Sequence, residues 1–336
     1  MSTFKEIQGR NIRSYTTNPD NPLEGQMWYN QTELSLKGFV TLEAWASGGS
    51  AGSNHAAGVG AGTQTAALTS GGREGAGAPT ISSNSEEYNG SSWSEGNNMN
   101  TAITFMGSCG SQTAALSAAG RTSSGPTGNT GITNSEKYDG TSWTATNVLN
   151  TARYAVFVAG TTGAALAAGG YNSTLPSTNV TNITEEWDGT NWSAVPGTLG
   201  SARYRGVGTG TQTAALACLG YNYSPNITAK TEEYDGTSWT SGGDANTARS
   251  ALGGSGIQTA TLVFGGAPGA KTSTEAYDGT SWSNKPSLSQ GRDSINGASL
   301  GTTTATLGVG GRNGPTFYNN TEEFTAALNI EKITTS

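Results

Sequence analysis

Acidic residues occur in adjacent pairs at nearly regular intervals along the chain. The pairs are Glu86/Glu87, Glu185/Glu186, Glu232/Glu233 and Glu322/Glu323. Two carboxyl groups at one site are the machinery of glycoside hydrolysis, in which one protonates the leaving group and the other acts as base or nucleophile. A catalytic pair is needed once, whereas this pair recurs, which favours a solvated or hydrogen-bonded structural role. We therefore predict no catalysis, with a carbohydrate-active enzyme as the minor alternative.

Cationic residues also recur at one position of the repeat. Thirteen residues before a recurring leucine stand His55, Ile103, Arg153, Arg203 and Arg249, and Arg292 stands 15 residues before Leu307. If the repeats surround an axis, these side chains form a ring on a rim or channel, where guanidinium groups bind anions such as sugar acids or phosphates. The alternative is structural: each arginine pairs with a repeated glutamate or caps carbonyl groups at the start of a strand.

The sequence lacks the residues that other common catalytic and binding sites require. The chain has one histidine, so neither a copper site with two histidine ligands nor a conventional serine or cysteine hydrolase is expected. Glycine-rich stretches such as GVGAGTQT lead into predicted strands and lack the helix N-terminus that binds phosphate. The two cysteines, Cys109 and Cys218, fall at different places in their repeats, which predicts free, partly buried thiols. We expect no cofactor and no metal.

Composition limits the class of protein. The 336 residues carry a net charge of −7, and the 17 basic residues are scattered, which argues against nucleic-acid binding. Eight Trp and twelve Tyr are too many for a disordered chain, so an ordered β protein rich in small residues is predicted. No apolar run is long enough to span a membrane, and the N-terminus has no secretory signal.

Three markers define a repeat of about 45 to 50 residues. The first is a TAAL-like segment with a glycine-rich end, whose leucines are Leu68, Leu116, Leu166, Leu216, Leu262 and Leu307. The second is an aromatic residue after the acidic pair: Tyr88, Tyr138, Trp187, Tyr234, Tyr277 and Phe324. The third is a Trp five residues later: Trp93, Trp143, Trp192, Trp239 and Trp282. The missing sixth Trp has a candidate in Trp45, 48 residues before Trp93.

Each repeat reads as four short strands, the last two joined by an Asp-Gly type I′ turn. Four-stranded units repeated around an axis make a β-propeller. The last repeat lacks its Trp strand, and residues 41–46 form an orphan strand bearing Trp45. We therefore predict an all-β, six-bladed propeller over residues 39–326, with the last blade closed by the N-terminal strand, and a C-terminal tail over residues 327–336.

The repeat resembles the kelch repeat, which has a diglycine after an apolar strand, then an aromatic residue, then a Trp. Gly169-Gly170 with Trp187 and Trp192 matches this pattern well, as does Gly265-Gly266 with Tyr277 and Trp282. The resemblance covers roughly residues 40 to 325 and implies a six-bladed propeller. Enzymes, adaptors and adhesins are all built on that scaffold, so the fold leaves the function open.

Residues 1–38 lie outside the repeat. The segment NPDNPLEGQMWYNQTELSLKG predicts a hairpin with strands near Gln26 to Tyr29 and Glu33 to Lys37. It resembles motifs of bacteriophage tail-fibre and other virion proteins, and the repeat text TEEYDGTSWTSGG is similar to kelch-type proteins of marine phages, especially cyanophages. The resemblance implies a virion structural protein, present in multiple copies and assembled in the host cytoplasm.

On this interpretation the protein is non-enzymatic. Residues 1–38 would dock to other tail or capsid proteins, with Trp28 and Tyr29 as candidate contacts, although the segment could equally wrap the propeller. The propeller would display loops to a host-surface receptor, expected to be a polysaccharide. The candidate recognition residues are Tyr171, Asn172, Tyr221, Tyr223, Phe317 and Tyr318. The alternative is a purely structural decoration or fibre-anchoring subunit that contacts other virion proteins.

Overall fold

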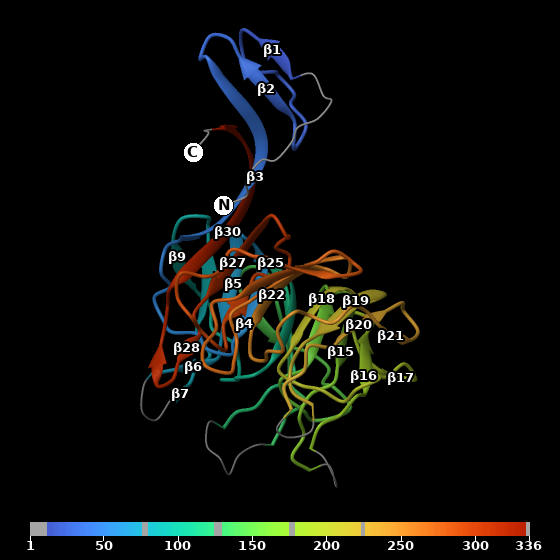
Figure 1. The fold of residues 1–336 in the computed structure, drawn as a ribbon. Coiled ribbons are helices and arrows are strands. Elements are labelled where there is room, and N and C mark those ends of the chain that lie inside the picture. Colours follow the sequence, from blue (N-terminus) through green and yellow to red (C-terminus); the bar gives the residue numbers. More distant parts are fainter. Residues whose placement is uncertain (1–11, 76–79, 124–129, 175–178, 223–225, 334–336) are drawn as a thin grey trace. The chain divides into compact units, whose positions relative to one another are not determined.

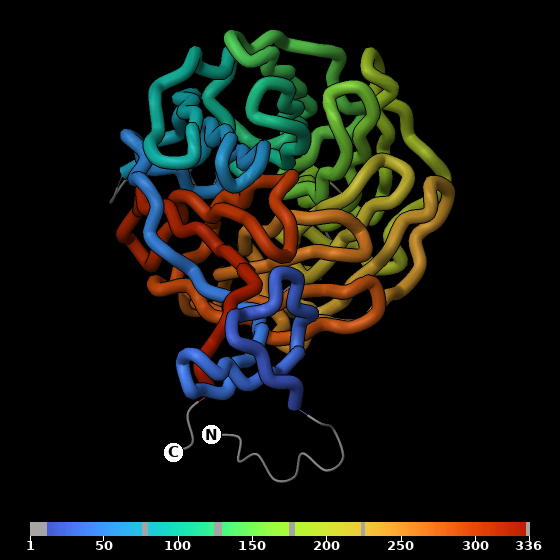
Figure 2. The backbone as a smooth tube through the Cα atoms, turned by 90° about the horizontal axis from the view of Figure 1, so that it is seen from above, coloured from blue at the N-terminus to red at the C-terminus, as the bar shows by residue number. Residues whose placement is uncertain are grey.

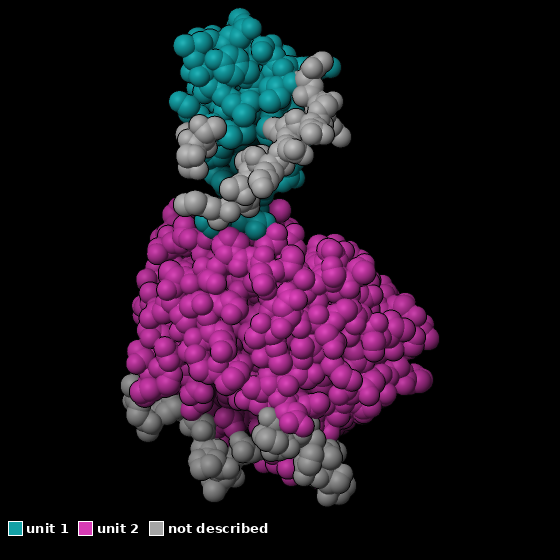
Figure 3. Space-filling view, in the orientation of Figure 1, with its two compact units in different colours: residues 1–44, 325–336 teal, residues 45–324 magenta. Residues whose placement is uncertain are grey.

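The computed structural model describes residues 12–75, 80–123, 130–174, 179–222 and 226–333. These residues form strands, turns and irregular segments without any helix, so the described chain has no helix able to cross a membrane. The chain divides into two compact units, coloured separately in Figure 3. Unit 1 comprises residues 1–44 and 325–336, and unit 2 comprises residues 45–324.

Unit 2 is built from repeated four-stranded antiparallel sheets (Figure 1). Five of them are β4 (Val59–Thr63), β5 (Ala66–Ser70), β8 (Ser85–Tyr88) and β9 (Trp93–Gly96); β10 (Gly107–Ser111), β11 (Ala114–Ala118), β12 (Ser135–Tyr138) and β13 (Trp143–Ala145); β14 (Phe157–Gly160), β15 (Ala165–Ala168), β16 (Thr184–Trp187) and β17 (Trp192–Val195); β18 (Val207–Thr211), β19 (Ala214–Cys218), β20 (Thr231–Tyr234) and β21 (Trp239–Ser241); and β22 (Gly253–Ile257), β23 (Ala260–Phe264), β24 (Thr274–Tyr277) and β25 (Trp282–Lys285). The predicted all-β chain of four-stranded units is confirmed, and the fold is propeller-like.

A further set of strands comes from both ends of the chain. The strands β26 (Asn296–Gly297), β27 (Ala305–Val309), β30 (Thr321–Lys332) and β3 (Ser35–Ser47) are neighbours in that order. Short strand pairs lie between the second and third strands of two sets, namely β6 (Arg73–Glu74) with β7 (Thr80–Ile81) and β28 (Arg312–Asn313) with β29 (Thr316–Phe317).

The first strand of each set is the innermost one. It contacts the first strand of the next set, in the order β4, β10, β14, β18, β22 and β26, and β26 contacts β4. Figure 2 shows the backbone of unit 2 passing around a centre in chain order. Glycine permits this approach: a Cβ on Gly297 would lie only 2.4 Å from the carbonyl oxygen of Gly254.

Aromatic rings fill the outer strands, as predicted. In the five four-stranded sheets, the third-strand aromatic ring lies 5.0 to 5.4 Å from the fourth-strand Trp ring, centroid to centroid. Trp45 lies 5.3 Å from Phe324 in the same way. Its indole N–H donates to Thr274 at 3.0 Å, as Trp239 donates to Thr184 at 3.0 Å in another sheet. Trp45 therefore makes the same kinds of contact as the fourth-strand Trp residues of the other sheets.

Tyrosine hydroxyls and the second glutamate of each pair link neighbouring sheets. The bonds are Tyr88 to Glu323, Tyr138 to Glu87, Tyr234 to Glu186 and Tyr277 to Glu233. Where the aromatic residue has no hydroxyl, the glutamate is replaced. Lys137 lies 4.9 Å from the centre of the Trp187 ring, and Ala276 stands at the position matched to Phe324. The contact explains why an acidic pair precedes the aromatic residue.

The Asp-Gly turn differs from the predicted type I′ hairpin. In the β20–β21 connection the register leaves four residues, Asp235 to Ser238, in the loop. Of these only Gly236 has a positive φ, at 90°, whereas a type I′ turn needs two. The Asp235 carboxylate instead accepts the backbone N–H groups of Thr237 and Ser238 at 2.8 and 2.7 Å. These hydrogen bonds lower the pKa of Asp235.

Unit 1 contains the predicted N-terminal hairpin. Strand β1 (Arg13–Tyr15) pairs in parallel with β2 (Met27–Asn30), which pairs antiparallel with the start of β3. The predicted boundaries after residues 38 and 326 differ from the observed units, because unit 1 continues to residue 44 and begins again at residue 325. The predicted C-terminal tail is instead the continuation of β30, as far as Lys332.

Candidate functional site

The predicted ring of cations is buried inside the sheets. Arg153, Arg203, Arg249, Arg292 and His55 each have an exposed fraction of 0%. A fully buried guanidinium cannot reach a ligand on a rim, so the prediction of an anion-binding rim is wrong for these residues. The structural alternative describes them correctly.

Each buried arginine bonds to its own sheet. Arg203 donates through Nη1 to the carbonyls of Leu219 at 3.3 Å and Lys230 at 2.7 Å, and through Nη2 to Ala217 at 3.3 Å and Glu232 at 2.8 Å. The other ion pairs are Arg249 with Glu275 and Arg292 with Glu322, both at 2.8 Å, and Arg153 with Glu185 at 3.2 Å. Burial lowers the pKa of Arg203 and the Glu232 carboxylate raises it. The arginine thus satisfies carbonyl groups around the turn that follows the second strand.

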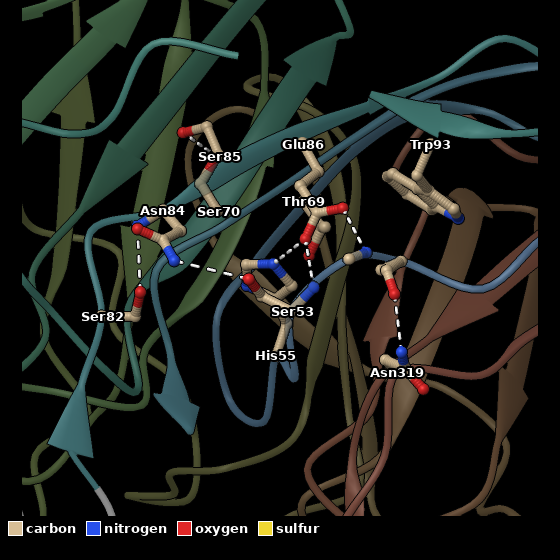
Figure 4. Close-up of polar contacts among 12 residues, drawn as sticks. Ser53, His55, Thr69, Ser70, Ser82, Asn84, Ser85, Glu86, Trp93 and Asn319 are labelled. Atoms are coloured by element: carbon tan, nitrogen blue, oxygen red, sulfur yellow. Dashed lines mark hydrogen bonds and ion pairs between the residues drawn. The ribbon is translucent and has the colours of Figure 1, made fainter. Parts of the chain in front are cut away.

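His55 takes the place of the arginine in the first repeat (Figure 4). Its Nδ1 lies 2.8 Å from the Gly71 carbonyl, and its Nε2 lies 3.1 Å from the Glu86 carboxylate. Both partners are acceptors, an arrangement that the doubly protonated ring satisfies. Glu86 also accepts the N–H groups of Gly52 at 2.6 Å and Ser53 at 2.8 Å. Burial raises the pKa of Glu86, but these hydrogen bonds outweigh it and leave the pKa below its ordinary value.

The first glutamate of each pair is committed to structure. Glu185, Glu232 and Glu322 are 0 to 4% exposed, and each accepts a backbone N–H from the segment before the first strand. In the second repeat Ile103 replaces the cation, and Glu136 keeps the N–H of Asn100 at 2.9 Å. Since the second glutamates bind tyrosine hydroxyls, both members of the pairs have a structural partner.

A ring of six backbone hydrogen bonds surrounds the centre of unit 2. Each ring residue lies just before a first strand, has a φ between 52° and 61°, and donates its N–H to the equivalent residue of the preceding repeat. The ring residues are Ala57, Phe105, Ala155, Arg205, Ala251 and Ser294. The N···O distances are 2.6 to 2.9 Å, and the bond from Ala57 to Ser294 returns the ring to its start.

The ring residues line a cavity of about 100 Å³. A second cavity of about 110 Å³, lined by the innermost strands, shares Gly58, Met106, Val156 and Asn296 with it. The two cavities therefore adjoin each other, and we call the first one, lined by the six ring residues, the axial mouth. Most of the wall is small or apolar, with polar groups supplied by Arg205, Ser294 and Asn296.

Arg205 lines the axial mouth, Arg121 shares the Phe105 ring with it, and the charges of Arg312, Arg121 and Arg205 all act on Arg73. The guanidinium carbons of Arg121 and Arg205 both lie 4.8 Å from the centre of the Phe105 ring, within cation–π range. Burial lowers the pKa of Arg73, and the positive charges of the other three arginines lower it further. The cluster therefore concentrates positive charge in a protein whose net charge is negative.

Arg205 is the member of the cluster that lines the cavity, and like Arg73 it has an Nε without a partner among the described residues. Within the described part of the chain its half-buried guanidinium makes no hydrogen bond or ion pair, and its Nε is shielded from solvent without a partner. Arg312, in contrast, pairs with Asp293 at 3.1 Å, and Asp293 also accepts the Ser294 hydroxyl at 2.8 Å. Burial lowers the pKa of Arg205 and Asp293 raises it. An anion at the mouth would supply the partner that Arg205 lacks.

Aromatic rings border the same opening. Phe105, Tyr154, Tyr171, Tyr204 and Tyr221 follow one another with ring centroids 5.0 to 6.0 Å apart. Phe105 and Tyr154 are buried, and Tyr171 and Tyr204 pack against them while remaining partly exposed. Burial raises the pKa of Tyr154 to about 12, so its hydroxyl is protonated in neutral solution.

The structure brings only some of the predicted recognition residues to the mouth. Tyr171 and Tyr221 belong to the aromatic series, whereas Asn172 is 5% exposed and binds Thr174. Tyr223 lies outside the described residues.

The remaining predicted contacts are divided between the two units. In unit 2, Phe317 pairs in register with Arg312, and Tyr318 follows it, half-buried. In unit 1, Trp28 is 0% exposed and donates to Asn18 at 3.2 Å, so the prediction of Trp28 as a docking contact is wrong. Tyr29 is half-buried.

The described residues contain no group of three or more His, Cys, Asp or Glu side chains that could hold a metal ion. Cys109 and Cys218 are free and buried, as predicted, and burial raises the pKa of both thiols to about 12.

Sequence reasoning missed the mouth arginines because it followed the wrong register. Arg73, Arg121 and Arg312 directly follow the glycines that end the second strand, and Tyr171 and Tyr221 occupy the same position in other repeats. That register is visible in the sequence. The sequence does not show which register faces the centre, because that depends on the left-handed backbone conformation of the ring residues.

Comparisons with known proteins support the fold and leave the function open. No protein-family model and no curated protein matches the sequence. A solved structure titled "Structure of YjhT" matches with a TM-score of 0.66 and 12% sequence identity, and the match covers 84% of this chain and 99% of that chain. At this identity the likeness concerns the fold alone.

Proposed function

We propose that unit 2 is a closed six-bladed propeller and that the protein is a non-enzymatic virion component that binds a host-surface carbohydrate. The six sets of strands, the returning ring of hydrogen bonds and the contact between Trp45 and Phe324 support six blades and closure by β3. The sequence resemblance to kelch-type phage proteins supports the virion assignment.

The observation that carries the recognition role is the uncommitted cation of Arg205 among aromatic rings. The buried arginines and glutamates are occupied by structural bonds, whereas Arg205 lines a cavity without a hydrogen bond or ion pair to a described group. The mouth is built on six strand sets and a ring of backbone hydrogen bonds. Binding groups presented on a rigid scaffold are typical of recognition proteins.

Unit 1 supplies the docking function of this proposal. Its apolar side chains Leu23 and Leu34 are 76% and 75% exposed, which suits a contact with another virion protein better than the buried Trp28. In this proposal unit 1 docks to the virion and the axial mouth of unit 2 recognises the host.

Competition with the virus tests this function. Purified full-length protein, added to host cells before the virus, is expected to bind the cells and to reduce adsorption in proportion to its concentration. An Arg205→Gln variant should compete poorly, and Lys230→Gln, which removes an exposed cation elsewhere, should compete as the parent does. Failure of the parent protein both to bind cells and to block adsorption would contradict the proposal, and release of sugar products would contradict the non-enzymatic assignment.

A further inference from the structure

We propose that the axial mouth binds one acidic sugar unit of a polysaccharide, with its anionic group on Arg205 and its ring against the neighbouring tyrosines. This inference rests on the proposed function and names the ligand chemistry of the same site. It is carried by three observations on the mouth: charge, aromatic surface and the state of the backbone.

The charge of the mouth selects an anion. Arg205 lines it and Arg121 lies against the same Phe105 ring, and the nearby carboxylate of Asp293 is already bonded to Arg312 and Ser294. Arg205 lies in the cavity wall with neither hydrogen bond nor ion pair to a described residue. A planar guanidinium binds carboxylate or sulfate oxygens through paired N–H donors, so both anionic groups fit the same position.

The aromatic series favours a sugar as the carrier of that anion. Tyr171, Tyr204 and Tyr221 are partly exposed and lie within 5.0 to 5.5 Å of their neighbours in the series. The C–H groups on the face of a pyranose ring pack well on such surfaces, and a tyrosine adds a hydroxyl that hydrogen-bonds to sugar hydroxyls. A cavity of about 100 Å³ is too small to enclose a pyranose ring, so it admits the anionic group while the ring of that unit stays outside against the tyrosines.

The backbone of the mouth argues against an acidic peptide. An extended peptide is held through main-chain hydrogen bonds to a free edge. Here the N–H and C=O groups of all six ring residues are already bonded to one another. Recognition at this site therefore depends on side chains, which suits a sugar with a charged group and hydroxyls.

Calorimetric titration of the full-length protein tests the inference with four polymers: polygalacturonate, dextran sulfate, neutral dextran and polyglutamate. Polygalacturonate or dextran sulfate is expected to bind, and their relative affinities identify the anionic group as carboxylate or sulfate. Arg205→Gln should weaken this binding by about tenfold or more, whereas Lys230→Gln should leave it within about twofold. Thermal unfolding of each variant checks that the fold is intact.

Several results would overturn the inference. These are equal binding of neutral dextran, tighter binding of polyglutamate at Arg205, no loss of binding in Arg205→Gln, or no binding by any acidic polymer. Failure of this ligand assignment can be distinguished from failure of the proposed host-recognition function. If the protein blocks adsorption but binds no acidic glycan at Arg205, the ligand assignment fails alone. If it binds the glycan at Arg205 but neither binds host cells nor blocks adsorption, the host-recognition function fails.

Discussion

Arg203 and Arg205 are separated by one residue and have opposite environments. Arg203 is fully buried and is bonded to three carbonyls and to Glu232. Arg205 is half-buried with no described anion bonded to it. The same side chain thus serves the stability of the sheet at one position and remains available to a ligand at the other. Composition does not distinguish the two roles.

We expect Arg203→Gln to lower the free energy of unfolding by about 3 to 5 kcal/mol, because it leaves the Glu232 charge buried without its cation. Arg205→Gln is the matched control and should change the free energy by less than about 1 kcal/mol, since it removes a desolvated charge that has no ion pair. Urea unfolding of both variants measures the difference. Equal losses would show that the two environments are misassigned.

The tyrosines that link the sheets predict a loss of stability at high pH. Burial, and then the hydrogen bond to Glu323, raises the pKa of Tyr88 to about 12 from an ordinary 10.0. Burial and the bond to Glu233 raise that of Tyr277 likewise to about 12. Between pH 10 and 12 these tyrosines keep their protons in the folded state but lose them in the unfolded state. The free energy of unfolding therefore falls as the pH rises from about 10 to 12. Urea midpoints at pH 9, 10 and 11 measure this, and a flat profile would contradict it.

The elements explain why the repeat keeps an acidic pair. The first glutamate accepts a backbone hydrogen bond from the segment that enters its own sheet, and the second accepts a hydrogen bond from the tyrosine of the next sheet. Two natural replacements, Lys137 beside Trp187 and Ala276 matched to Phe324, follow this rule within one chain. The residue type at the second position of the acidic pair therefore depends on the aromatic residue that it contacts in the adjacent sheet, and not on its own strand.

A double-variant cycle tests this rule. We expect Ala276→Glu alone to cost about 1 to 3 kcal/mol, because it buries a carboxylate that faces a phenyl ring with no donor. Adding Phe324→Tyr should recover part of the loss, since the new hydroxyl can donate as Tyr277 does to Glu233. The two effects should couple by roughly 0.5 to 3 kcal/mol in chemical denaturation. Strictly additive effects would show that the positions do not meet.

Sequence reasoning predicted these elements because their markers are periodic. The Leu, aromatic and Trp positions define the strands, and the orphan Trp45 identifies the strand that lies beside Phe324. The turn type was wrong because the Asp235 side chain closes a four-residue loop. Most residues of the axial mouth were not predicted, because non-glycine residues such as Phe105 and Arg205 have a left-handed backbone conformation. No local sequence pattern predicts that conformation at these positions.

At the scale of the whole molecule, the two ends of the chain belong to one set of strands. Strand β3 neighbours β30, and within unit 2 the N–H of Gly48 donates to Thr321 at 3.0 Å and that of Ala51 to Asn319 at 2.9 Å. In the proposed closed propeller this pairing holds the ring shut, and the axial mouth exists only while the ring is shut. The division between unit 1 and unit 2 crosses both strands.

The most direct test of closure is thermal unfolding of two N-terminal truncations, followed by near-ultraviolet circular dichroism. A chain that begins at residue 39 loses the hairpin of unit 1 but keeps Trp45, and we expect it to unfold cooperatively at nearly the temperature of the full chain. A chain that begins at residue 48 loses Trp45 and the strand beside β30, and we expect it to have no cooperative transition. Cooperative unfolding of the shorter chain at an unchanged temperature would contradict closure by the N-terminal strand.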